Sequence, residues 1–328
     1  MSQASQRSQS DLAGSVGARV TIRLKEAGGG FRDIVGILEK FVNGSGEVIN
    51  AKGVSQTFSE GEIAIWREIK PLPDRAGTGA PYSLRINELE ALSDATWPAD
   101  QKIEFGKWRL RISDGFTMRA NSVLPMGSAP FGEPGVEIRK AVEEIIDIYK
   151  SHGLTPTFTI PMPNYEGLDR YLDQQGWTVK VGAEYLVNNI PTDLDLSSSE
   201  YQILVSNVPT EDWLQVQSDF ALERIMRNYP AKYAELKLQK KTIAIGRIAT
   251  QGSWSLATRV FVDPHFRGKG VGALLMRVLM SAARGEGATK IGLQVDVENG
   301  AALALYKSMG FRSHHPYTYR VLESGASK

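Results

Sequence analysis

The chain has 328 residues, of which 42% are hydrophobic and 23% charged, with a formal net charge of +1 and no cysteine. This is the composition of an ordinary globular protein with room for two or three domains. The small net charge gives no excess of cations for nucleic acid or a membrane surface, and the lack of cysteine excludes disulfides and a thiol nucleophile. The start of the chain is polar, and no stretch reaches the roughly 18 apolar residues of a membrane span. We therefore expect a cytoplasmic protein that binds neither nucleic acid nor membrane.

The N-terminal quarter of the chain predicts a small β domain. Residues 1–14 are rich in serine and glutamine, which predicts a disordered tail. Residues 15–74 form short strand patterns between turns: apolar and polar side chains alternate over 18–24, and Gly-Ser-Gly at 44–46 marks a tight turn. Several short strands at this spacing predict a small all-β barrel, and the segment resembles an SH3-like module. The prolines and glycines of 75–84 predict a linker.

The rest of the chain contains a faint internal repeat. Residues 157–177 and 290–311 each give a strand, a loop with an asparagine, an amphipathic helix, and a glycine followed by an aromatic residue. The repeat divides the chain into two related α/β halves, 85–195 and 196–328, which we expect to pack edge to edge. A glycine-rich loop at 267–272 precedes the second copy, and the first half lacks that loop pattern. The first half is therefore expected to be degenerate.

The glycine-rich loop predicts the ligand. A β-branched and aromatic strand at 254–262 leads into Arg-Gly-Lys-Gly-Val-Gly at 267–272, and an amphipathic helix follows at once. Glycines let the backbone approach a ligand closely and adopt positive φ without strain. The free amides and the positive dipole end of the helix attract an anion. We expect a phosphate-bearing ligand that is held mainly by backbone groups.

Two common phosphate-binding motifs fit this loop poorly. A P-loop requires serine or threonine after Gly-Lys, but Gly270 follows Lys269. A dinucleotide-binding fingerprint fits the spacing of Gly268, Gly270 and Ala273, with Asp296 as its ribose acid. However, four residues separate the strand from the first glycine, and the sequence after Ala273 is too short for the rest of such a sheet.

A third interpretation explains more of the sequence. The loop resembles the acetyl-CoA pyrophosphate loop of the GCN5-related N-acetyltransferases, and the resemblance covers about residues 254–312. Downstream residues match the family's Asn-x-Ala-Ala-x-x-Leu-Tyr-x-x-x-Gly-Phe signature: Asn299, Ala301, Ala302, Leu305, Tyr306, Gly310 and Phe311. The resemblance implies a mixed α/β (α+β) acetyltransferase fold. It also implies direct transfer of an acetyl group from acetyl-CoA, the co-substrate, to a primary amine.

The resemblance assigns roles to residues of the second half. Backbone groups of Phe261 and Val262 pair with the pantetheine arm, near which Asn299 also lies, and Tyr306 is the general acid that protonates the departing thiolate. The pyrophosphate is bound by the loop residues Arg267, Gly268, Lys269, Gly270, Val271 and Gly272.

The general base remains open. The strand at 254–262 has no carboxylate where many family members carry a glutamate. Glu223, Asp296, Glu298 or a chain of waters are the alternatives. Four scattered histidines and no cysteine predict that the protein has no metal site.

The acceptor is suggested by a short charged segment. Glu223, Arg224 and Arg227 lie on a helix that helps to form the acceptor site in the family, and two arginines three apart can clamp a carboxylate. The layout, with an SH3-like module first, resembles a group of actinobacterial acetyltransferases that includes N-acetylglutamate synthases of arginine biosynthesis. We therefore expect a small-molecule amine acceptor, such as an amino acid, with glutamate as the first choice.

Two other functions stay open at this point. The barrel could dock a protein or peptide, whose lysine or N-terminal amine would then be the acceptor. The missing strand carboxylate is compatible with a non-catalytic sensor that only binds acetyl-CoA. A homo-oligomer is compatible with the sequence in each case.

Overall fold

The computed structural model describes residues 12–50, 54–68, 82–127, 133–198 and 200–323. The chain divides into two compact units, Met1–Asp74 and Arg75–Lys328. Most of the expected tail and linker lies outside the described residues. Leu12, however, is completely buried in the core of the first unit. Residues 12–14 therefore belong to the fold and not to a tail, because an apolar side chain there closes the core.

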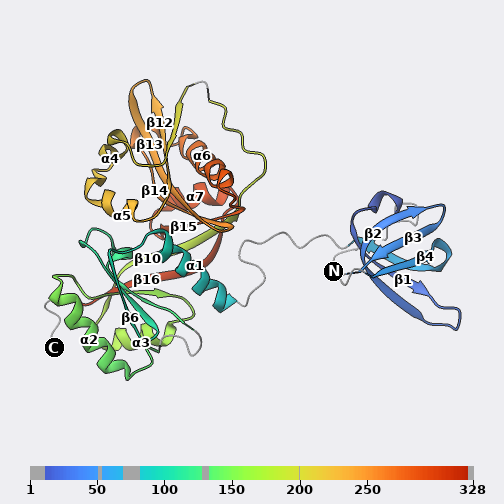
Figure 1. Ribbon diagram of the computed structural model, residues 1–328, viewed down its shortest axis with the longest axis horizontal. Helices are drawn as coiled ribbons and strands as arrows, with labels where there is room; N and C mark the ends of the chain where they lie inside the picture. The colour runs from blue at the N-terminus through green and yellow to red at the C-terminus, as the bar shows by residue number, and fades with distance from the viewer. Residues whose placement is uncertain (1–11, 51–53, 69–81, 128–132, 199, 324–328) are drawn as a thin grey trace. The chain divides into compact units, whose positions relative to one another are not determined.

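The first unit is a five-stranded antiparallel sheet with the order β4-β3-β2-β1-β5 (Figure 1). Val20, Ile22 and Leu24 are fully buried and alternate with exposed or half-buried residues, as the two-residue period of a half-buried strand requires. The predicted closed barrel is not found among the described strands, because β4 and β5 form the two edges and do not pair with each other. The elements are η2 (Ala13–Ser15), β1 (Arg19–Lys25), β2 (Phe31–Val42), β3 (Ser45–Ile49), β4 (Ser55–Ser59), η3 (Glu60–Glu62) and β5 (Ile63–Glu68).

The second unit is built on one mixed sheet of 11 strands with the order β11-β12-β13-β14-β15-β10-β16-β9-β8-β7-β6. The first half contributes α1 (Tyr82–Thr96), β6 (Gln101–Phe105), β7 (Trp108–Ile112), η4 (Met118–Ala120), β8 (Val123–Pro125), α2 (Ile138–Ser151), β9 (Thr157–Pro161), α3 (Glu166–Gln174) and β10 (Thr178–Asn189). The second half contributes β11 (Gln202–Ser206), α4 (Glu211–Val216), η5 (Asp219–Leu222), α5 (Glu223–Arg227), β12 (Lys232–Leu238), β13 (Lys241–Gln251), β14 (Trp254–Val262), η6 (Pro264–Phe266), α6 (Val271–Gly285), β15 (Lys290–Asp296), α7 (Gly300–Ser308) and β16 (Arg312–Val321).

The two halves exchange their last strands. The first half ends in β10, which pairs with β15 of the second half, and the second half ends in β16, which pairs with β9 of the first. The strands β10 and β16 also pair with each other and lie between the halves in Figure 1. The halves are therefore joined more intimately than the expected edge-to-edge packing, because each one completes the sheet of the other.

Helices cover both faces of the sheet in the second half. The apolar stripe of α6, which includes Leu275 and Leu279, packs against Ala244 and Ile248 of β13. On the opposite face Trp213 of α4 and residues of α5 form a second core. Within the described parts of the chain, the helices are all too short or too polar to cross a membrane.

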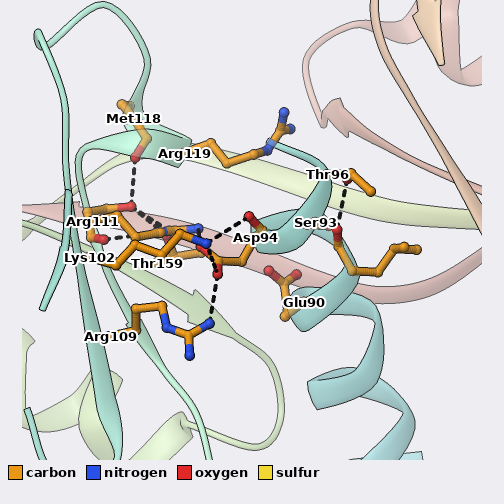
Figure 2. A network of polar contacts seen from close by, with 12 residues as sticks. Glu90, Ser93, Asp94, Thr96, Lys102, Arg109, Arg111, Met118, Arg119 and Thr159 are labelled. Carbon is orange, nitrogen blue, oxygen red and sulfur yellow. Dashed lines mark hydrogen bonds and ion pairs between the residues drawn. The ribbon is translucent and has the colours of Figure 1, made fainter. Parts of the chain in front are cut away.

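Helix α1 begins the first half in sequence but also packs against strands of the second. Its Leu89 and Leu92 share a core with Leu256 of β14, and its Thr96 carbonyl accepts a hydrogen bond from Arg247 of β13 at 3.1 Å. Asp94 of the same helix pairs with Lys102 and Arg109, each at 2.8 Å (Figure 2). The helix thus fixes the first half against the strands that lead to the glycine-rich loop.

Candidate active site

The site forms where two parallel strands separate. Strands β14 and β15 pair from Trp254 with Lys290 to Ala257 with Leu293, and their pairing ends there. Two residues later Arg259 has a φ of 54°, and the register between β13 and β14 shifts at the same place. Such a bulge bends its strand. The end of β14 therefore follows β13 and leaves β15, and the edge it exposes can accept an added strand-like ligand.

A cavity of about 470 Å³ opens at this separation, and both halves line it. The second half provides residues 257–260 of β14, 293–296 of β15 and the start of α7. The first half provides Trp97 and residues 116–119, while the exchanged strand β16 adds Tyr317 and Tyr319. The first half therefore shapes the site, although it carries no glycine-rich loop.

The glycine-rich loop has the backbone geometry that the sequence predicted. Gly268 and Gly270 have φ angles of 73° and 77°, and a Cβ added at either would meet no atom within 4 Å. The space beside the loop is thus open, and a non-glycine residue there would be strained. The Leu274 amide donates the first hydrogen bond of α6, to the Gly270 carbonyl. The amides of residues 271–273 stand before that bond and have no carbonyl of the helix to donate to. These features fit a diphosphate bound by backbone amides.

Gly272 serves packing and not loop conformation. A Cβ there would lie 2.9 Å from Leu305 Cδ2, so the missing side chain lets α6 approach α7. Val271 is buried beside it in the same core.

The two basic residues of the loop are placed differently from each other. Arg267 Nε donates to the Val262 carbonyl at 3.1 Å, and its guanidinium lies 5.8 Å from the centre of the Phe261 ring. Arg267 therefore ties the loop to the end of β14. Lys269 is exposed, with its ammonium 5.4 Å from the Phe266 ring centre.

Asn299 and Tyr306 line the cavity from α7. The Asn299 side-chain oxygen caps the helix by accepting from the Ala302 amide at 3.1 Å. The Tyr306 side chain is buried, with its ring 5.5 Å from that of Phe311. Burial raises the pKa of the Tyr306 phenol to about 12. Tyr306 therefore stays protonated at neutral pH and can donate a hydrogen bond into the cavity.

The three predicted acceptor residues do not reach this cavity. Arg224 pairs with Asp100 at 2.8 Å and Asp114 at 2.5 Å, and Arg227 pairs with Glu223 at 2.6 Å. None of the three side chains lines the cavity. Their charges are satisfied within the protein, so the expected carboxylate clamp is not what this structure presents.

Of the three carboxylates considered as the base, Asp296 alone lines the cavity. It ends β15, and its Oδ1 accepts from the Glu298 amide at 2.8 Å. On β14 the cavity is lined by Thr258 and Arg259, and Arg259 pairs with the buried Asp219. Among the described residues no group of three metal-ligating side chains occurs.

Sequence reasoning missed Arg119, Gln294 and the two tyrosines of β16. Arg119 Nε donates to Gln294 Oε1 at 2.9 Å, across 175 residues of sequence. No local motif marks these positions, because they meet through the strand exchange and the packing of η4 on the second half.

Comparison with known proteins agrees with the geometry. The family model described as "Probable histone acetyltransferase Rv0428c C-terminal" matches residues 84–320. A solved GCN5-related N-acetyltransferase from Kribbella flavida has the same fold, with a TM-score of 0.59 at 15% identity over 73% of this chain and 96% of that one. The chain belongs to the GCN5-related N-acetyltransferases. It is therefore an acetyltransferase of the family that uses acetyl-CoA.

Two relatives match this acetyltransferase over nearly their whole length. An uncharacterized N-acetyltransferase, YobR of Bacillus subtilis, is 29% identical over 72% of this chain and 98% of its own. The probable histone acetyltransferase Rv0428c of Mycobacterium tuberculosis is 23% identical over 94% of this chain and 96% of its own.

A tandem protein of the same fold from the clavulanic acid biosynthesis pathway has a TM-score of 0.54 at 14% identity.

Proposed function

We propose that this acetyltransferase moves the acetyl group of acetyl-CoA directly to the primary amine of a small molecule bound between β14 and β15. The observation that carries the proposal is the separation of these strands after Ala257, with the glycine-rich loop opening onto the same edge. Acetyl-CoA supplies the activated acetyl thioester. The open backbone at Gly268 and Gly270 fits its diphosphate, and the free edge of Phe261 and Val262 fits its pantetheine arm.

The loop and the ends of β14 and α7 would hold the co-substrate. The amides of 268–272 bind the diphosphate, Lys269 adds an exposed charge, and Arg267 keeps the loop against β14. Asn299 lies beside the pantetheine arm while its oxygen caps α7. A backbone amide near the Arg259 bulge faces the thioester oxygen and stabilises the charge that develops on it.

Proton transfer falls to two side chains in this proposal. The acceptor ammonium loses one proton before attack and a second as the C–N bond forms, while the sulfur gains one as the C–S bond breaks. Asp296, at the cavity rim, takes a proton from the amine directly or through water. Tyr306 donates to the departing sulfur and regains a proton from water. Burial raises the pKa of the Tyr306 phenol, and the same burial raises the pKa of a CoA thiol beside it. The difference between the two pKa values is therefore smaller than the raised phenol pKa alone suggests.

The test is thiol release from acetyl-CoA with a panel of free amino acids including glutamate, polyamines, and a lysine peptide. Release with a small amine supports the proposal. Release with the peptide alone would favour protein acetylation, which is also the activity in the name of the Mycobacterium tuberculosis relative. Acetyl-CoA binding without release for any amine would favour the sensor.

A further inference from the structure

Arg119 places a cation where the reacting groups must meet. The residue belongs to η4 of the first half, and its guanidinium donates twice to Gln294 of β15. Gln294 follows Leu293, which forms the last rung between β14 and β15. The guanidinium therefore lies at the point where the strands separate, within the cavity that would hold the thioester.

The charge of Arg119 has no carboxylate partner among the described residues. Its hydrogen bonds go to neutral groups, the Gln294 amide oxygen and the Tyr317 phenol, whereas Arg259 in the same cavity is paired with Asp219. The carboxylate nearest in its network, Glu90, is reached through Gln294 at 3.4 Å and is also bonded to the buried His315 at 3.1 Å. A partly buried cation without a counterion is costly, so the site favours a ligand that brings an anion.

The surroundings of Arg119 suit a small planar anion. Its guanidinium lies 5.8 Å from the centre of the Trp97 ring, which holds it by a cation–π contact. In Figure 2 its side chain extends away from Arg111 and the Asp94 network. The pKa of the neighbouring Tyr317 phenol is raised well above its ordinary value, chiefly by burial and secondly by Tyr319, against the influence of Arg119. Tyr317 is therefore a neutral donor beside the cation.

We infer that the acetyl acceptor carries a carboxylate close to its amine and that Arg119 binds this carboxylate. The inference rests on the proposed acetyl transfer and names its substrate class: free amino acids and similar short amino-carboxylates. The amine must reach the thioester at the strand separation while the carboxylate reaches Arg119 at Gln294, so both groups belong to one short molecule. A peptide N-terminus lacks the free α-carboxylate beside its amine, and a lysine side chain within a peptide carries no carboxylate next to its amine.

The experiment compares each accepted amino acid with its own amide, in the wild type and in Arg119→Gln. We expect the wild type to prefer the acid by about 10- to 100-fold in kcat/KM, since charge-assisted hydrogen bonds have that value. Arg119→Gln should reduce the preference to within about threefold. The α-amine of an amino acid amide has a lower pKa than that of the free acid, so the two substrates differ in reactivity as well as in charge. The decisive quantity is therefore how much of the preference for the acid is lost in Arg119→Gln. Arg139→Gln, at an exposed position of α2, is the matched control.

A second measurement keeps the test independent of turnover. Calorimetry on the CoA-loaded protein compares binding of an N-acetyl amino acid with that of its amide. Tighter binding of the acid, lost in Arg119→Gln while CoA affinity and urea unfolding stay unchanged, supports the inference. Equal binding of acid and amide, or a preference that survives in Arg119→Gln, overturns it. Equal thiol release with amides and acids would overturn the inference but leave the proposed acetyl transfer standing. Absence of release with every amine would refute the acetyl transfer, and calorimetry would then decide whether Arg119 binds a carboxylate.

Discussion

The two halves of the second unit follow one layout but differ at the place where their parallel strands meet. In the second half β14 and β15 separate around a cavity of about 470 Å³. In the first half β8 and β9 pair only at Val123 and Phe158, and buried side chains bridge them. The Arg111 guanidinium donates to Ser122 Oγ at 2.7 Å and to Thr159 Oγ1 at 2.8 Å, which ties the two strands together.

The second half has an arginine in a similar position, with different partners. Arg247 of β13 lies opposite Thr258 and donates to its hydroxyl at 3.5 Å, while the rest of its guanidinium donates to the carbonyls of Thr96 and Met226. It therefore does not cross to β15. The comparison shows how a few buried polar contacts decide whether a separation between strands is filled or left for a ligand.

The helices after the strands differ in the same way. Tyr306 stands four residues before Gly310 in the second half, and Leu172 stands four residues before Gly176 in the first. Leu172 is fully buried in the core of its half, while Tyr306 lines the cavity. A phenol can donate a proton and a leucine cannot.

Removing this phenol should have the largest effect. Tyr306→Phe is expected to lower kcat by about 100-fold, the usual contribution of a general acid, while acetyl-CoA affinity changes by less than about threefold. Steady-state kinetics and calorimetry measure the two quantities. Since the pKa of Tyr306 is about 12, wild type and variant should have parallel kcat profiles from pH 7 to 10. Unchanged kcat would remove Tyr306 from the acid role. An alkaline decrease near pH 10 in the wild type alone would keep the acid role and contradict the raised pKa of this phenol.

The next effect comes from the loop that the first half lacks. Gly270 has a φ of 77°, which costs a β-branched residue about 1–3 kcal/mol, so Gly270→Val should weaken acetyl-CoA binding by roughly 10- to 100-fold. Gly285→Ala, at the other end of α6 and without a positive φ, is the control. Calorimetric affinity equal to wild type in Gly270→Val would contradict a backbone-held diphosphate.

A smaller effect is expected where the first half is filled. Arg111→Met removes the guanidinium that donates to the Ser122 carbonyl and to the hydroxyls of Ser122 and Thr159, and should lower the free energy of unfolding by about 1–3 kcal/mol. Urea denaturation measures this, with the exposed Arg139→Met expected within about 0.5 kcal/mol of wild type. Acetyl-CoA affinity should not change. A variant as stable as wild type would show that these contacts do not hold β8 to β9.

An effect that develops only at acidic pH concerns the strand that joins the halves. Burial, followed by the charges of His315 and Arg85, lowers the pKa of His314 to about 4. The unfolded chain, with a pKa near 6.5, then binds its proton first as the pH falls. Stability is full above pH 6.5 and decreases as the pH falls towards 4, and His314→Gln should flatten this dependence. Urea unfolding midpoints of the wild type and His314→Gln at pH 7, 5.5 and 4.5 measure this dependence. An equal decrease of the midpoint with pH in the two proteins would contradict the lowered pKa of His314.

The sequence was informative where the chemistry is local. The strand at 254–262, the glycines of the loop and the following helix form one continuous segment. The resemblance it carries predicted the family, and its glycines predicted the positive φ angles of the loop. The strand exchange could not be predicted, because the residues that pair across it, such as Ala183 with Asp296, lie more than 100 residues apart and no local pattern selects the partner strand. Arg224 could not be distinguished from a ligand-binding residue, since its partners Asp100 and Asp114 lie more than 100 residues earlier. Arg119 was missed for the same reason.

The most direct test of the contrast between the halves is a calorimetric count of acetyl-CoA sites on the wild-type chain. We predict one site per chain, in the second half, with the site lost or strongly weakened in Gly270→Val and unchanged in Arg111→Met. Two sites per chain, or one site whose affinity is insensitive to Gly270→Val, would contradict the account.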